Sequence, residues 1–168
     1  MEYLDIVNLD DQPIGRASKA VIYKNNHLHR IVHVFVLNDK GEIALQLRAK
    51  NKSYCPHRWA SSAGGHVQAG ETFKKAGLRE LREELGIDSP LAFLSKNLYD
   101  DPIAVGLKKF ICAFTTKHNG PFQIEERELE KVEFFNVDQA RELIKNEKYI
   151  HPEALFLLKN YLLKDSDD

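Results

Sequence analysis

The chain has 168 residues, the size of one ordinary domain, of which 43% are hydrophobic and 29% are charged. This balance is typical of a globular protein and excludes disordered, collagen-like and low-complexity chains. Lys and Arg total 24 against 25 Asp and Glu, a formal net charge of -1. The charge excludes a global field that would recruit nucleic acid or an acidic membrane.

The first half of the chain predicts strands separated by polar loops. Alternating or Val- and Ile-rich patterns indicate strands at residues 2–8, 30–37 and 42–48. Pro, Gly and polar clusters indicate loops at residues 10–15, 38–41, 49–58 and 64–70. The second and third strands are expected to form a hairpin because only a short turn separates them.

The second half of the chain adds helices. Residues 72–85 predict a helix that Thr72 caps and Gly86 ends. Another helix is expected over residues 138–145 with Asp138 as its cap, and a last one begins at Pro152. The last helix has an expected apolar face of Ala154, Leu155, Leu158, Tyr161 and Leu162. The expected strands of this half are residues 91–98, 103–115 and 131–135, with a polar loop at 117–130.

Strands interleaved with a few helices predict a single α/β domain over residues 1–168, with a mixed sheet between helical layers. The apolar runs are far shorter than a membrane-spanning helix, and the acidic, mixed start does not have the pattern of a secretory signal. The cytoplasm is therefore the expected location. Cys55 and Cys112 are too few for a disulfide framework or a cysteine metal site, and one pair between them stays open.

The predicted helix over residues 72–85 carries two opposite stripes. At 100° per residue, Leu78, Leu81 and Leu85 fall on one side of the helix. Glu80, Glu83 and Glu84 fall on the other side, where three carboxylates within one turn repel each other. Solvent or a divalent cation relieves that repulsion, and hard oxygen ligands suit magnesium or manganese better than zinc.

The surrounding sequence favours the cation. The chain reads Gly65, five residues, Glu71, seven residues, Arg79-Glu80-Leu81, one residue, Glu83-Glu84, one residue, Gly86-Ile87. Residues 65–87 thereby resemble the signature of the Nudix hydrolases at all nine constrained positions. This resemblance implies a Nudix fold, an α/β/α sandwich with a mixed sheet. It also implies hydrolysis of a nucleoside diphosphate derivative, such as a nucleotide or a dinucleotide.

The resemblance also implies roles for the matching residues. Glu80, Glu83 and Glu84 correspond to carboxylates that hold divalent cations, with the Gly65 carbonyl as a further ligand. Glu71 and Arg79 correspond to an ion pair that orients those ligands. Metal ions cancel the charge of the diphosphate and lower the pKa of a bound water, from which a carboxylate then accepts a proton. Either Glu83 or Glu84 is the expected base, and the choice between them stays open.

A narrower resemblance links roughly residues 29–135 to the type I isopentenyl-diphosphate isomerases. The residues that carry it are Leu28, His29, Arg30, Arg48, Lys52, Pro56, Trp59, Gly65 and His66. Arg48 and Lys52 match isomerase residues that contact the substrate diphosphate, and a nearly neutral protein needs such a local anion clamp. Glu128 matches an isomerase glutamate, and its role as a metal ligand, a base or part of a solvated acidic loop stays open.

Two departures argue against isomerase activity. Gly64 stands where the isomerases have their catalytic cysteine, and Ile22 stands where they have the third metal-binding histidine. His29 and His66 match the other two histidines, with structural and functional roles both open. The expected activity is therefore metal-dependent diphosphate hydrolysis. The alternatives are an isopentenyl-diphosphate isomerase and a non-catalytic nucleotide sensor.

The expected partner is a small-molecule diphosphate, without a membrane or nucleic acid, and a homodimer stays open because dimers are common among Nudix enzymes. Specificity in such a fold comes from loops outside the motif, here chiefly residues 49–62 and 117–130.

Overall fold

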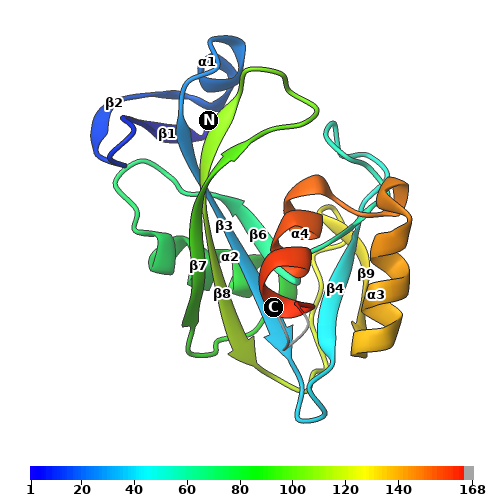
Figure 1. The fold of residues 1–168 in the computed structure, drawn as a ribbon. Coiled ribbons are helices and arrows are strands. Elements are labelled where there is room, and N and C mark those ends of the chain that lie inside the picture. The colour runs from blue at the N-terminus through cyan, green and yellow to red at the C-terminus, as the bar shows by residue number, and fades with distance from the viewer. Residues whose placement is uncertain (165–168) are drawn as a thin grey trace.

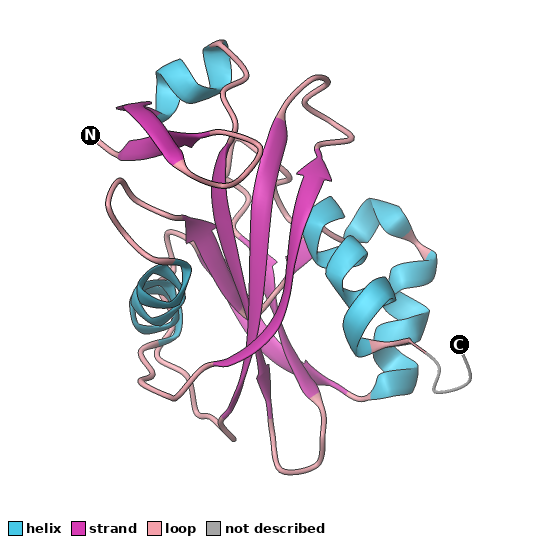
Figure 2. Cartoon of the chain, turned by 60° about the vertical axis from the view of Figure 1, so that its left-hand side comes forward, coloured by secondary structure: helices cyan, strands magenta, loops and turns pink. Residues whose placement is uncertain are grey.

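The computed structural model describes residues 1–164, which build a sheet covered by helices on both faces. Helix α2 (Phe73–Leu85) lies on one face, and helices α3 (Val137–Lys145) and α4 (Pro152–Leu157) lie on the other (Figures 1 and 2). This arrangement confirms the expected α/β/α sandwich with a mixed sheet.

Seven strands form the main sheet: β3 (His29–Leu37), β4 (Ile43–Arg48), β5 (Trp59–Ala60), β6 (Ala63–His66), β7 (Ala92–Asp100), β8 (Lys108–Lys117) and β9 (Leu129–Phe135). Their order is β5-β4-β3-β8-β7, with β6 paired to β3 and β9 paired to β4. Only β3 and β8 run parallel, while the other pairs are antiparallel.

The expected hairpin of β3 and β4 is confirmed, but the two strands pair only beside the turn. Val36 lies opposite Ala44, and Leu37 lies opposite Ile43. Beyond this point β4 pairs with β9, and β6 takes the place beside β3, with Gly64 opposite His33 and Gly65 opposite Val32. The divergence of β3 and β4 therefore brings the glycines of β6 into the middle of the sheet.

Two apolar clusters form the core, one on each face of the sheet. Phe35, Ile111 and Leu157 belong to the cluster under α3 and α4. Val32 and Val34 pack with Leu81 and Leu85 of α2 in the other cluster. Adjacent residues of β3 thus point to opposite faces, as alternation in a strand requires. Such a central strand is apolar on both sides, which explains the continuous Val- and Ile-rich run in the sequence.

A separate hairpin of β1 (Tyr3–Val7) and β2 (Pro13–Ser18) leads into the short helix α1 (Lys19–Lys24) at the top of Figure 1. The sequence predicted β1 but missed β2 and α1. Strand β2 is exposed along most of its length and contains Pro13 and Gly15, so it lacks the alternation that marks a strand.

The predicted ends of α2 are confirmed. The Thr72 hydroxyl accepts a hydrogen bond from the Lys75 N–H at 3.2 Å, and Gly86 ends the helix with a φ of 66°. The helix predicted over residues 138–145 is confirmed as α3, but its predicted cap was wrong, because Asn136 rather than Asp138 caps it. Asn136 and Gln139 exchange side-chain and backbone hydrogen bonds at this end.

Other boundaries differ from the sequence prediction: β7 ends at Asp100 rather than at residue 98, and β9 begins at Leu129 rather than at residue 131. Strand β8 begins at Lys108 rather than at residue 103, because the Asp101 carboxylate accepts the N–H groups of Ile103 and Ala104 and holds them in a loop. After Pro152, the α-helix changes to a π-helical segment, Leu158–Leu162. Tyr161 lies in this segment and is exposed, so it was wrongly predicted to share the apolar face.

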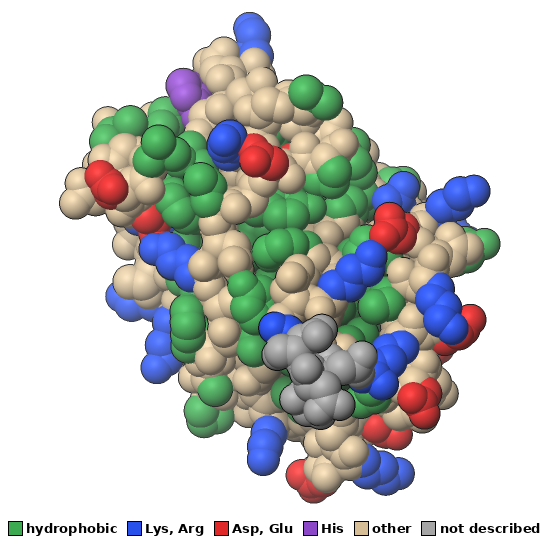
Figure 3. All heavy atoms as spheres, in the orientation of Figure 1, with side chains coloured by type: hydrophobic (Ala, Val, Ile, Leu, Met, Phe, Trp, Pro, Cys, Tyr) green, Lys and Arg blue, Asp and Glu red, His purple; other side chains and the backbone are tan. Residues whose placement is uncertain are grey.

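Among residues 1–164, no helix has the length and apolar content needed to cross a membrane. Cys55 and Cys112 are both free and buried, which answers the open question of a pair between them. Charged side chains of both signs are distributed over the face of the molecule seen in Figure 3. This distribution agrees with the small net charge of the chain.

Candidate active site

The three glutamates of α2 do not form a solvated stripe. Glu80 and Glu84 are only 9% and 6% exposed, whereas the side chain of Glu83 is 58% exposed. Glu80 and Glu84 face β6 of the sheet, and Leu81 and Leu85 pack into the core beside them. Two carboxylates are thus buried next to each other, a costly arrangement unless positive charge or hydrogen-bond donors compensate for it.

Glycines of β6 make room for these carboxylates. A Cβ atom at Gly65 would lie 2.4 Å from Oε1 of Glu80, so only glycine lets the strand approach this closely. The Gly64 N–H donates to Oε1 of Glu84 at 3.2 Å, and Nε2 of Gln46 donates to its Oε2 at 2.5 Å. Gln46 was missed by sequence reasoning, since nothing in the motif marks a residue of β4.

Burial changes the proton affinity of both acids. It raises the pKa of Glu80 to about 8, with a further contribution from the charge of Glu84. It also raises the pKa of Glu84 to about 7, against the hydrogen bonds from Gln46 and Gly64. Both directions show that the site favours added positive charge or protons.

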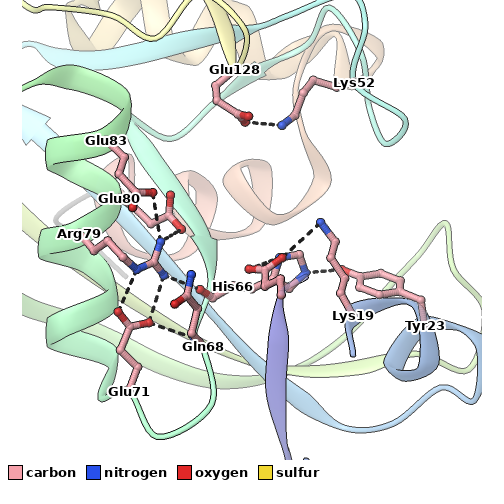
Figure 4. A network of polar contacts seen from close by, with 11 residues as sticks. Lys19, Tyr23, Lys52, His66, Gln68, Glu71, Arg79, Glu80, Glu83 and Glu128 are labelled. Carbon is pink, nitrogen blue, oxygen red and sulfur yellow. Dashed lines mark hydrogen bonds and ion pairs between the residues drawn. The ribbon is translucent and has the colours of Figure 1, made fainter. Parts of the chain in front are cut away.

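Arg79 supplies positive charge at the centre of this cluster (Figure 4). Its Nε and Nη2 donate to the two carboxylate oxygens of Glu71, at 2.9 and 3.0 Å. Its Nη1 donates to Glu80 at 2.7 Å and to Glu83 at 3.2 Å. The hydrogen bonds from Arg79 lower the pKa of Glu71 against the opposing effect of burial. The structure thus brings together the predicted Glu71–Arg79 pair and two of the predicted metal ligands.

No three His, Cys, Asp or Glu side chains within residues 1–164 converge into a ready-made metal centre. Arg79 holds Glu80, while Gln46 and Gly64 hold Glu84. The donor chemistry nevertheless fits a divalent cation, because Glu80, Glu83, Glu84 and the Gly65 carbonyl all offer hard oxygen. Two of these acids are buried beside the glycines of β6, so a bound cation would compensate their negative charge.

The two predicted substrate cations, Arg48 and Lys52, belong to β4 and to the loop that follows it. Lys52 forms an ion pair with Glu128, which Figure 4 shows across from the α2 carboxylates. Arg48 donates from Nη2 to the Tyr54 carbonyl at 2.9 Å and from Nε to the Cys55 carbonyl at 3.1 Å. Arg48 therefore shapes the loop that carries Lys52, and Glu128 compensates the charge of Lys52.

His29 and His66 meet a tyrosine that the sequence comparison overlooked. Their rings stack at 5.7 Å, and the Tyr23 hydroxyl lies 2.8 Å from Nε2 of His66. Ile22, at the matched isomerase position, is buried in the core instead. Burial lowers the pKa of His29 to about 4 and moves the pKa of His66 well below its ordinary value. Both imidazoles are therefore neutral near pH 7.

A family model described as NUDIX domain matches residues 27–157. This chain belongs to the Nudix family. The uncharacterized Nudix hydrolase PA4841 of Pseudomonas aeruginosa is 30% identical to it over 162 residues, which are 96% of this chain and 94% of that protein. The family match and this relative support a Nudix-type hydrolase, and enzymes of the Nudix family generally use divalent metals.

The chain is also similar to an isomerase and to a solved structure. Isopentenyl-diphosphate Delta-isomerase 2 of Photorhabdus laumondii is 41% identical over 98 residues, which are 58% of this Nudix chain and 55% of the isomerase. The match thus spans about half of that isomerase. The crystal structure of DR0079 from Deinococcus radiodurans matches with a TM-score of 0.78 over 94% of this chain and 97% of that chain. At 24% identity it shows the Nudix fold alone.

Proposed function

We propose that this protein is a hydrolase, dependent on magnesium or manganese, that cleaves the diphosphate linkage of a nucleoside diphosphate derivative. The observation that carries the proposal is the placement of Glu80 and Glu84, two buried acids, against the glycines of β6. Arg79, which pairs with Glu71, also holds Glu80. Oxygen ligands, a bracing ion pair and nearby lysine are the groups that hydrolysis of a diphosphate requires.

Each residue has a part in the proposed reaction. Glu80, Glu83, Glu84 and the Gly65 carbonyl would hold the cation, which when bound would offset the charge of the diphosphate and lower the pKa of the attacking water. Arg79 orients Glu80 through its 2.7 Å hydrogen bond. Glu83 or Glu84 accepts the proton from the attacking water.

The predicted clamp of Arg48 and Lys52 acts on the substrate itself. In the free protein Lys52 pairs with the Glu128 carboxylate. When substrate binds, Lys52 exchanges this carboxylate for a phosphate oxygen of the diphosphate, which carries the same negative charge. Arg48 holds the backbone of the same loop and places its own positive charge beside it. A small molecule with a diphosphate group is therefore the proposed partner.

The packing around Gly64 favours the hydrolase over the isomerase. A Cβ atom at this position would lie 2.7 Å from the carbonyl oxygen of Val32, a backbone atom in the centre of the sheet. A cysteine here would force β3 and β6 apart. The isomerase reaction needs that thiol in the matched position, so this geometry supports hydrolysis.

Substitution of Glu83 tests the proposal. The Glu83→Gln side chain keeps its shape and is largely exposed, so folding should stay intact. Turnover should fall by about three orders of magnitude or more if metal assistance is lost. The measurement is release of phosphate and nucleotide from a panel of diphosphate compounds, in magnesium, in manganese and in EDTA.

The matched control is Glu142→Gln, an exposed helical glutamate of α3 whose side chain is 74% exposed. It should retain the turnover of the unchanged protein. Turnover of Glu83→Gln equal to that of this control would remove Glu83 from the mechanism. Tight nucleotide binding without turnover in the unchanged protein would instead favour a sensor.

A further inference from the structure

A buried network of charged side chains lies on the face of the sheet that α4 covers, opposite α2. Nζ of Lys109 donates to Asp101 at 2.8 Å and to Glu153 at 2.6 Å. Glu153 also contacts Nε2 of His33 at 2.8 Å through its second oxygen. All four residues are buried. The network therefore joins strands β3 and β8, the loop after β7, and the C-terminal helix.

The charges of this network are mutually compensated. Burial would lower the pKa of Lys109, but the charge of Glu153 and the hydrogen bonds to Asp101 and Glu153 together raise it. Burial would raise the pKa of Glu153, but the bond to His33 and the charge of Lys109 move that pKa well below its ordinary value. A buried ion pair of this kind adds little net stability compared with apolar packing.

One arm of the network reaches the proposed metal ligands. Nδ1 of His33 lies 2.7 Å from Oγ of Ser61, and this hydroxyl donates to the Ala63 carbonyl at 3.1 Å. The next residue is Gly64, whose N–H binds Glu84 at 3.2 Å. A continuous series of contacts thus runs from α4 through β3 and β6 to a buried carboxylate of α2.

The other arm reaches the loop that carries Lys52. The Tyr54 hydroxyl donates to the two oxygens of Asp101, at 3.1 and 3.0 Å. The backbone after Tyr54 is unusual, because Cys55 and His57 have φ angles of 48° and 52° in the left-handed region. Such a loop holds its shape only when surrounding contacts fix it. The Tyr54 hydroxyl and the Arg48 guanidinium supply these contacts.

We infer that Lys109 and Glu153 are positioning residues that set two parts of the proposed hydrolase site, through Ser61 for the metal ligands and through Tyr54 for the substrate loop. The inference rests on the proposed function for its kinetic consequences. Neither Lys109 nor Glu153 touches the substrate in this account, and neither belongs to the Nudix signature.

Two single-oxygen deletions separate the arms. Ser61→Ala should lower kcat about tenfold and raise the magnesium concentration for half-maximal rate, with KM unchanged. Tyr54→Phe should raise KM about tenfold and leave kcat and the magnesium requirement unchanged. A merely structural network would not divide the two constants in this way. The same changes in kcat and KM in both variants, or no change in either constant in either variant, would overturn the inference.

Matched controls remove a single oxygen elsewhere. Ser89→Ala deletes a hydroxyl bonded to the Lys117 carbonyl, and Tyr161→Phe deletes one bonded to Asn97. Both lie outside the network and should have the constants of the unchanged protein. If Ser89→Ala lowered kcat as Ser61→Ala does, the arm through Ser61 would be contradicted. If Tyr161→Phe raised KM as Tyr54→Phe does, the arm through Tyr54 would be contradicted.

A readout without activity tests the loop arm independently of the proposed reaction. Cys55 is buried in the loop, and Cys112 is buried in β8, so the two thiols serve as probe and internal reference. Tyr54→Phe should increase alkylation of Cys55 by iodoacetamide about tenfold relative to Cys112, as measured by peptide mass spectrometry. Ser61→Ala should leave this ratio unchanged. An unchanged ratio in Tyr54→Phe would overturn the loop arm even if no diphosphate is cleaved.

The Lys109→Met variant tests Lys109 itself, which bonds both Asp101 and Glu153. It should combine both effects, with lower kcat, higher KM and faster Cys55 alkylation. If this variant does not fold, the two single-oxygen variants still decide the inference. The unchanged protein could cleave no diphosphate while Tyr54→Phe still increases alkylation of Cys55. In that case the proposed function fails and the positioning role of the loop arm stands.

Discussion

At the adjacent positions Gly64 and Gly65, a side chain would clash with different groups. A side chain at Gly64 would meet a backbone oxygen, that of Val32, at 2.7 Å. A side chain at Gly65 would meet the carboxylate end of Glu80 at 2.4 Å. The backbone atom is fixed by the sheet, whereas the end of a glutamate side chain can move. The first glycine therefore maintains the sheet, and the second maintains the position of Glu80.

This difference gives a prediction for two alanine substitutions. Gly64→Ala should destabilise the protein by about 2 kcal/mol or more, because β3 and β6 must separate. Gly65→Ala should change stability by less than about 1 kcal/mol and reduce turnover at least about tenfold, because Glu80 moves. Urea unfolding and initial rates check both variants. Equal losses of stability would contradict the distinction.

The sequence marked the candidate site residues that share one short motif and missed the residues that contact them from elsewhere in the chain. Gly65, Glu71, Arg79 and Glu80 lie within a signature, and the structure brings them together. Gln46 and Tyr23 carry no such local pattern. His33 and Glu153 are 120 residues apart in the chain, and no periodicity connects them. Contacts of this separation depend on the whole fold and are not visible in one sequence.

At the scale of elements, the sequence predicted helices and strands whose ends carry strong local signals. Thr72 and Gly86 bound α2 as expected. Short elements without an apolar period were missed, namely β2, α1 and the glycine strand β6. In β6, pairing with β3 determines a strand that glycine-rich sequence disfavours.

The start of α4 predicts a dependence of stability on pH. Nδ1 of His151 accepts the N–H of Glu153 at 3.2 Å, so the ring must stay unprotonated there. Burial lowers its pKa to about 3 from 6.5. As the pH falls below 6.5, the unfolded chain binds a proton that the folded chain does not, so stability is lost. This loss amounts to about 1 kcal/mol between pH 7 and 5.5.

His151→Asn should remove that part of the pH dependence, because asparagine caps the helix without titrating in this range. Urea unfolding of both proteins at pH 7 and pH 5.5 measures the difference. The same slope in both proteins would show that His151 is not the titrating group.

For the molecule as a whole, we expect a divalent cation at Glu80 and Glu84 to stabilise the fold, because it would offset the charge of two buried acids. A cation that binds only the folded chain adds stability, about 2.7 kcal/mol at a hundred times its Kd. For a domain of this size we expect Tm to rise by about 5–10 °C in magnesium and to return in EDTA. A double variant, Glu80→Gln with Glu84→Gln, should not respond. Equal shifts in both proteins would place the cation elsewhere.

In the proposed reaction, water attacks a phosphorus atom of the diphosphate substrate. The most direct measurement is turnover of the compound panel, with isopentenyl diphosphate included, in ¹⁸O-labelled water with magnesium, followed by mass spectrometry of the products. We expect one labelled oxygen in a phosphate-bearing product and no product in EDTA. Conversion of isopentenyl diphosphate without cleavage or label would contradict it.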